Sequence, residues 1–153
     1  MSDPPSFSWA PFGPSAPEPT DAPDAAPART PAPAAPLSRI PARRVAVVTC
    51  MDPRIDPLML LGLSLGDAHV IRNAGAMASD DVIRSLHLSV EAAGTEAVVV
   101  MGHADCAAYG GDDEARAELV QSARRIAAAV DPDGSLSVDV RWFDPVSGTL
   151  ESL

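Results

Sequence analysis

Three residues whose side chains can bind a transition metal follow runs of residues that are expected to form strands. Cys50 follows the apolar run over residues 45–49, and His103 and Cys106 follow a second run over 97–101. The His-x-x-Cys spacing lets one turn bring an imidazole and a thiol to a single ion. Two thiolates and one imidazole suit zinc, and three protein ligands leave a fourth position open, as in catalytic zinc sites. The pattern therefore predicts a catalytic zinc site.

Two charged residues follow Cys50 at alternate positions, in Cys50-Met51-Asp52-Pro53-Arg54. Pro53 restrains the turn, and a residue that precedes a proline favours an extended backbone. Asp52 is then expected to point at the metal crevice, with Arg54 paired to it. A bidentate contact between the guanidinium and the carboxylate would fix the orientation of Asp52. We therefore predict Asp52 and Arg54 as the catalytic pair.

Each of these signals has an ordinary structural explanation when taken alone. A cysteine at the end of a buried strand is often a small core residue, and a lone His-x-x-Cys is a weak signal. The two signals together, with Asp and Arg at fixed positions after Cys50, favour a metal site. We interpret His69 and His87 as packed or surface residues. A thiol redox protein is disfavoured because the chain has no Cys-x-x-Cys pair.

The elements that must position these residues indicate an α/β fold. Apolar runs over 45–49 and 97–101 are typical of strands buried on both faces, and 68–72 and 138–143 are further strand candidates. Helices are expected over 57–65, after Ser79 and over 114–130. The order predicts a mainly parallel central sheet of about four strands with flanking helices and a C-terminal antiparallel strand around 149–150. Ligands of such sheets bind at the carboxyl ends of the strands.

Composition divides the chain and excludes several partners. Residues 1–41 hold 12 of the 16 prolines, which predicts a disordered Pro/Ala-rich arm before a folded domain over 42–153. The net charge is −10 and no basic block occurs, which argues against nucleic acid and against an anionic membrane surface. No apolar run is long enough to span a membrane. The N-terminus lacks the pattern of a secretory signal, so a cytoplasmic location is expected.

The motifs together resemble the β-class carbonic anhydrases, especially their short bacterial members. The resemblance runs from about residue 45 to Cys106 through Cys50-Met51-Asp52-x-Arg54 and Gly102-His103-x-x-Cys106, and includes residues 68–75 and 80–86. The closing stretch 143–150 is also similar. Three features depart from the family: Ala107 replaces a usual glycine, the segment after Cys106 is shorter than in many members, and the Pro/Ala-rich arm replaces an N-terminal helix.

The resemblance implies a zinc cofactor, reversible hydration of carbon dioxide to bicarbonate, and a homodimer or higher homo-oligomer. In the mechanism we expect, zinc-bound hydroxide attacks the carbon while Asp52 accepts a hydrogen bond and Arg54 holds Asp52 in place. The resemblance also implies that Asn73, Ala74 and Gly75 line the substrate pocket. In a closed state, with its pair to Arg54 broken, Asp52 is a possible fourth zinc ligand.

Two other functions remain open from the sequence. Carbonyl sulfide and carbon disulfide are linear molecules like carbon dioxide, so a hydrolase for either of them could use the same site. Alternatively, the changed segment after Cys106 and the long arm would suit a zinc-binding interaction module with weak catalysis.

Overall fold

The computed structural model describes residues 36–131 and 134–153. Its elements, in chain order, are β1 (Val45–Cys50), α1 (Pro57–Leu60), β2 (Ala68–Asn73), the short 3-10 helix η1 (Ala74–Ala76), α2 (Asp80–Ala93), β3 (Ala97–His103), α3 (Asp112–Val130), β4 (Ser137–Asp144) and β5 (Thr149–Ser152). Most of the arm predicted over residues 1–41 lies outside the described residues, so it stays a prediction. Within the described part, Pro41 is buried, and the carbonyl of Arg39 lies 3.1 Å from Nε2 of His69.

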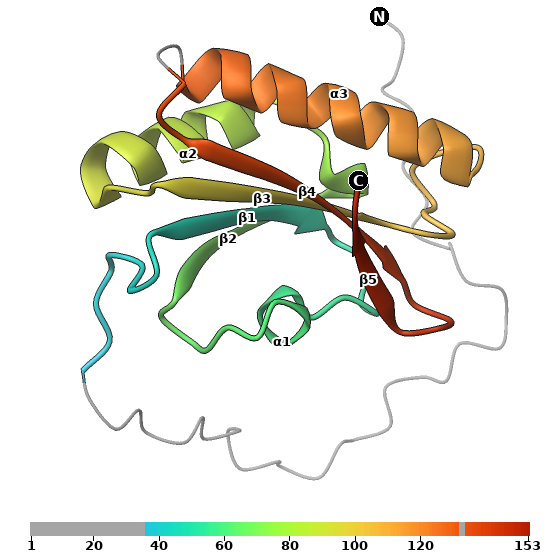
Figure 1. Cartoon of the computed structure of the whole chain (residues 1–153), viewed down its shortest axis with the longest axis horizontal. Helices are drawn as coiled ribbons and strands as arrows, with labels where there is room; N and C mark the ends of the chain where they lie inside the picture. Colours follow the sequence, from blue (N-terminus) through green and yellow to red (C-terminus); the bar gives the residue numbers. More distant parts are fainter. Residues whose placement is uncertain (1–35, 132–133) are drawn as a thin grey trace, which may run out of the picture. The chain divides into compact units, whose positions relative to one another are not determined.

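The five strands form one sheet in the order β2-β1-β3-β4-β5. β1 pairs in parallel with β2 and β3, β3 pairs in parallel with β4, and β4 pairs antiparallel with β5. This arrangement confirms the predicted α/β class, with four parallel strands and a C-terminal antiparallel strand (Figure 1). β1 and β3 are interior strands, which explains why their sequences are almost continuously apolar.

Helices α2 and α3 lie against one face of the sheet (Figure 1). α2 begins after Ser79, whose hydroxyl accepts a hydrogen bond from the amide of Val82, and it ends at Gly94 in the left-handed conformation. α3 begins at Asp112, two residues before the predicted start, because its first turn carries acidic side chains that the helix dipole favours. No described helix is both long enough and apolar enough to cross a bilayer.

The main core lies between these two helices and the sheet. Its fully buried members include Val48, Leu86, Val100, Leu119 and Ile126. On the opposite face lies α1, which is shorter than the helix expected over 57–65 (Figure 1). The chain leaves the helix after Leu60 and turns through Gly62, whose φ of 64° is outside the helical range. A smaller apolar cluster on this side includes Cys50 and Cys106 themselves, with Met101 and Phe143.

Candidate metal centre

The sheet register brings the three predicted ligands to one edge. β1 and β3 are adjacent and parallel, with Thr49 opposite Met101, so Cys50 and His103 end neighbouring strands on the same side. Cys106 lies in the turn that follows β3. One ligand atom from each of Cys50, His103 and Cys106 lies within 4.8 Å of the others, and all three residues are buried. This group could therefore hold a metal ion.

The hydrogen bonds of His103 fix which ring nitrogen faces the cluster. Nδ1 lies 2.9 Å from the carbonyl of Ala104, and because a carbonyl only accepts, Nδ1 must carry the proton. In the neutral ring Nε2 then has a free lone pair. Nε2 is buried and has no hydrogen-bond partner among the described residues. A buried nitrogen without a partner is costly, and a metal ion would satisfy it.

The two sulfur atoms have a separation that suits zinc. Sγ of Cys50 lies 3.8 Å from Sγ of Cys106. Two sulfurs bound to one tetrahedral zinc at about 2.3 Å would be about 3.8 Å apart. Burial, and the neighbouring Cys50, raise the pKa of the Cys106 thiol. A bound cation opposes this effect, because it favours the thiolate.

Asp52 and Arg54 form the predicted pair beside this cluster. The carboxylate accepts from Nε of Arg54 at 3.0 Å and from Nη2 at 2.8 Å, and one of its oxygens also accepts from the Arg54 amide at 2.9 Å. These hydrogen bonds hold the pKa of Asp52 well below its usual range. Oδ2 of Asp52 is 4.0 Å from Nε2 of His103, so the carboxylate borders the metal centre. Asp52 is therefore paired with Arg54 here, and its role as a fourth ligand stays a prediction.

Two more residues, for which no role was expected, support this pair. Asp105 accepts from Nη1 of Arg54 at 3.0 Å through its carboxylate, and its carbonyl accepts from Nη2 at 3.0 Å. Arg72 donates to the carbonyls of Cys50 and Asp52 at 3.0 and 2.7 Å. Arg54 thus ties the Cys50 turn to the Cys106 turn. Two sequence features could have pointed to these residues: Asp105 lies between His103 and Cys106, and Arg72 lies at the end of an expected strand.

A hollow of about 320 Å³ opens beside the centre. It is lined by Cys50, Met51, Asp52, Pro53, Ala74, Cys106, Ala107 and Ala108. Of the three predicted pocket residues, only Ala74 is in this lining. The side-chain amide of Asn73 instead pairs with the backbone of Met77, at 2.7 and 3.0 Å. Gly75 is buried, and its amide donates to Sγ of Cys50 at 3.4 Å.

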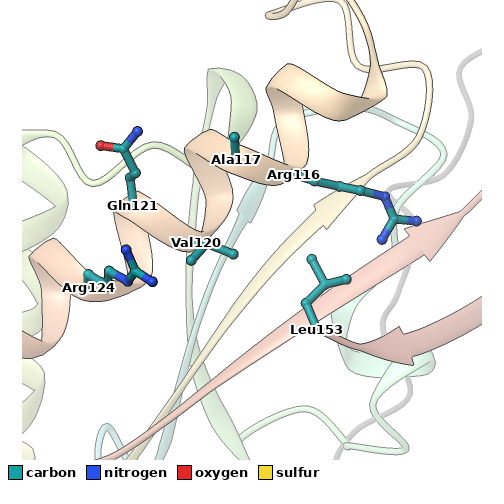
Figure 2. Close-up of a pocket in the computed structure, with 6 residues that line it drawn as sticks. All are labelled: Arg116, Ala117, Val120, Gln121, Arg124 and Leu153. Carbon is teal, nitrogen blue, oxygen red and sulfur yellow. The ribbon is translucent and has the colours of Figure 1, made fainter.

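A second hollow, of about 630 Å³, lies between α3 and the end of the chain (Figure 2). Its lining consists of Arg116, Ala117, Val120, Gln121, Arg124 and Leu153. Arg116 is already engaged, because it pairs with Glu151 at 2.8 Å and lies over the ring of Trp142. None of the predicted site residues lines this hollow.

Comparisons with known proteins agree with this geometry. The family model described as carbonic anhydrase matches residues 45–137. β-Carbonic anhydrase 1 of Mycobacterium tuberculosis is 48% identical over 71 residues, which are 46% of this chain and 44% of that protein. A carbon disulfide hydrolase of Saccharolobus solfataricus is 37% identical over 92 residues, which are 59% of this chain and 45% of that protein. The chain thus spans less than half the length of these curated relatives.

Solved structures extend the likeness over more of the fold. A carbonic anhydrase from Streptococcus mutans superposes with a TM-score of 0.60 at 32% identity, covering 77% of this chain and 86% of that one. A β-carbonic anhydrase from Trichomonas vaginalis gives a TM-score of 0.67 at 20% identity, and it supports the fold alone. With the family model covering most of the described domain, the chain belongs to the β-carbonic anhydrase family.

Proposed function

We propose that this protein catalyses the zinc-dependent reversible hydration of carbon dioxide to bicarbonate. The observation that carries the proposal is the group of three buried donors, Cys50, His103 and Cys106, in which Nε2 of His103 lacks any other partner among the described residues. We assign these three side chains as the zinc ligands. Their chemistry suits zinc, and three protein ligands leave one position for a water molecule.

A zinc ion in this position would act as a Lewis acid that makes water a better nucleophile. The residues of the chain supply orientation. The guanidinium of Arg54 donates to both carboxylate oxygens of Asp52, which fixes the carboxylate so that one oxygen can accept a further hydrogen bond from water in a defined direction. The apolar residues Met51, Pro53 and Ala74 line the adjoining hollow, which suits an uncharged substrate. Arg54 contributes by positioning Asp52 rather than by touching substrate.

Stopped-flow measurement of carbon dioxide hydration tests this proposal. Protein loaded with zinc should accelerate hydration, and the same protein stripped with a chelator should not. Restoring zinc should restore the rate. A zinc-loaded protein that leaves the uncatalysed rate unchanged would contradict the proposed reaction and favour a zinc-binding interaction module.

A second candidate reaction is hydrolysis of carbonyl sulfide or carbon disulfide. It is favoured by the small apolar lining of the hollow, with three alanines at 74, 107 and 108, which leaves room for the larger sulfur atoms. The similarity to a carbon disulfide hydrolase supports the same candidate. Release of hydrogen sulfide from each substrate, measured beside carbon dioxide hydration on one preparation, separates the two reactions. The higher kcat/KM identifies the preferred substrate.

We further infer that the protein acts as a homo-oligomer in the cytoplasm. β2 lies at the edge of the sheet, and large apolar side chains are exposed on and near it, at Leu65 and Val70, and on α1, at Met59. Such a surface is typical of an interface between subunits. Cytoplasmic thiols are kept reduced, which preserves cysteine ligands. Light scattering on the full chain tests the assembly, and a monomer at micromolar concentration would contradict it.

A further inference from the structure

Tyr109 lies beside the metal centre, and the proposed reaction gives it no role. It follows Cys106 in the turn before α3, and its amide donates to the carbonyl of Cys106 at 3.2 Å. Its ring packs against both the main core and the smaller cluster around Cys50. Its hydroxyl donates to the carbonyl of Gly75 at 2.9 Å, 34 residues away in sequence. Tyr109 therefore joins the segment that carries one thiol to the loop beside the other.

The contact between Tyr109 and Gly75 is close as well as polar. Gly75 has a φ of 74°, a conformation that glycine adopts without strain. A Cβ on Gly75 would lie 2.6 Å from the hydroxyl oxygen of Tyr109 and 2.7 Å from its ring carbons. The ring thus occupies the space where a side chain would be. Both the backbone conformation and the tyrosine require glycine at this position.

Gly75 also contacts Cys50, a proposed zinc ligand, so the contact between Tyr109 and Gly75 can affect the metal centre. Its amide donates to Sγ of Cys50 at 3.4 Å. Glycine is the most mobile residue of the backbone, so this donor needs a restraint to stay directed at the sulfur. The Tyr109 hydroxyl supplies one, because it holds the carbonyl of the same residue. A tyrosine hydroxyl carries its proton near neutral pH, so it can serve as this donor.

We propose that Tyr109 is a positioning residue for the metal centre, which it serves by holding the Gly75 amide on the Cys50 sulfur. The inference rests on the proposed zinc site. An amide hydrogen bond to a thiolate draws electron density from the sulfur and stabilises its negative charge. The two hydrogen bonds, from Tyr109 to Gly75 and from Gly75 to Cys50, would then adjust how strongly the Cys50 sulfur donates electrons to a metal.

A tyrosine that only fills space makes a different prediction, so Tyr109→Phe is the informative variant. It keeps the ring and its packing but removes the hydrogen bond to Gly75. Thr95→Val serves as the matched control. It removes the buried contact of 2.6 Å between the hydroxyls of Thr95 and Ser89, before β3 begins and thus at the strand end opposite to His103. Each variant loses one hydroxyl contact, partly buried at Tyr109 and buried at Thr95, but only the Tyr109 contact leads to the metal centre.

The readout is the absorption spectrum of the cobalt-substituted proteins, which reports directly on the thiolate ligands. In Tyr109→Phe the sulfur-to-cobalt charge-transfer band should move to longer wavelength, because the Cys50 sulfur loses part of its hydrogen bond. Zinc affinity, measured by competition with a chelator, should fall about 10-fold, as for other groups that support a ligand. Thr95→Val should leave both properties as in the wild type, even where it lowers the Tm.

The outcomes separate this inference from the proposed reaction. An unchanged band and unchanged affinity in Tyr109→Phe would overturn the role of Tyr109. The same shift in Thr95→Val would also overturn it, because the effect would then follow general destabilisation. A wild type that binds cobalt and shows the predicted contrast, yet does not hydrate carbon dioxide, would refute only the reaction. A wild type that binds no metal would refute both.

Discussion

The domain buries polar side chains around a histidine in two places, and the two clusters differ in one respect. Near the amino end of β3, the ring nitrogens of His69 lie 2.8 Å from the Ser89 hydroxyl and 3.1 Å from the Arg39 carbonyl, and Ser89 also contacts Thr95. Every buried side-chain polar atom of that cluster has a partner. At the carboxyl end of the same strand, Nε2 of His103 is buried without one among the described residues.

The difference shows how a structural histidine is told from a ligand. Burial alone does not separate them, since both rings are at least partly enclosed. What separates them is whether every buried polar atom of the cluster has a hydrogen-bond partner without an added group. The polar atoms around His69 all have partners, whereas Nε2 of His103 has none among the described residues and two thiols lie close to it. The cluster around His69 therefore holds the fold together, and the cluster around His103 is suited to hold an ion.

Removing a proposed zinc ligand should give the largest effect. Cys106→Ser replaces a thiolate with a hydroxyl, which is a poor zinc ligand, so most of the zinc should be lost. Activity should fall by more than about 100-fold, since even groups that only support a ligand are worth 10–100-fold in affinity. Elemental analysis beside the hydration rate measures both. Full zinc content in Cys106→Ser would remove this residue from the metal centre.

The two histidines should respond in opposite ways to the same substitution. His103→Ala should lose zinc and activity. His69→Ala should keep both but lower the free energy of unfolding by about 1–3 kcal/mol, because Ser89 and a carbonyl lose their partner. Urea titration and zinc content, measured on both variants, test the contrast. Loss of zinc from His69→Ala at a temperature where the protein stays folded would contradict the purely structural role of His69.

Asp52→Asn should separate catalysis from metal binding. The amide keeps the shape of the carboxylate but loses its charge and part of its accepting capacity, so we expect full zinc content and a rate lower by about 10²–10⁴-fold. Arg54→Ala should also slow turnover. The double variant should be far from additive, because the two residues act as a unit. Loss of zinc from Asp52→Asn would instead identify Asp52 as a ligand.

The smallest effect is expected at Asp105. Its side chain is 83% exposed and is one of two carboxylates that pair with Arg54. Asp105 also has a φ of 54°, which asparagine tolerates, so Asp105→Asn should fold normally. Solvent screens an exposed ion pair of this kind and Arg54 keeps its pair with Asp52, so the rate should fall by less than about 10-fold with zinc unchanged. A loss as large as that of Asp52→Asn would show that Asp105 is the main support of Arg54.

Much of this arrangement could be predicted from the sequence because it depends on strand ends. Apolar runs mark β1 and β3, and parallel strands that share a sheet end on the same side. The positions of Cys50 and His103 follow from that rule, and Arg54 reaches Asp52 across only two residues. Both features follow from sheet topology or from short spacing in the sequence, so the periodicity and the residue types are enough to predict them.

The remaining details depend on where individual side chains point. The family resemblance implies that Asn73 lines the substrate pocket, whereas the hydrogen bonds of its side-chain amide to the backbone of Met77 are visible only in the folded chain. The second carboxylate that pairs with Arg54 belongs to Asp105, 51 residues away in sequence. The position of this carboxylate depends on the left-handed backbone conformation of Asp105, which no local sequence pattern requires. The contact of Tyr109 with Gly75 likewise needs the folded chain, because it joins two loops whose approach is set by the sheet.

The zinc content of the wild-type protein is the most direct test of the proposed metal site. Protein purified without chelator should contain one zinc per chain by elemental analysis, because Cys50, His103 and Cys106 form one group of donors. The same value should be reached when chelated protein is dialysed against zinc. A chain that contains no zinc after purification and takes up none on dialysis would contradict the assignment of these three residues as zinc ligands.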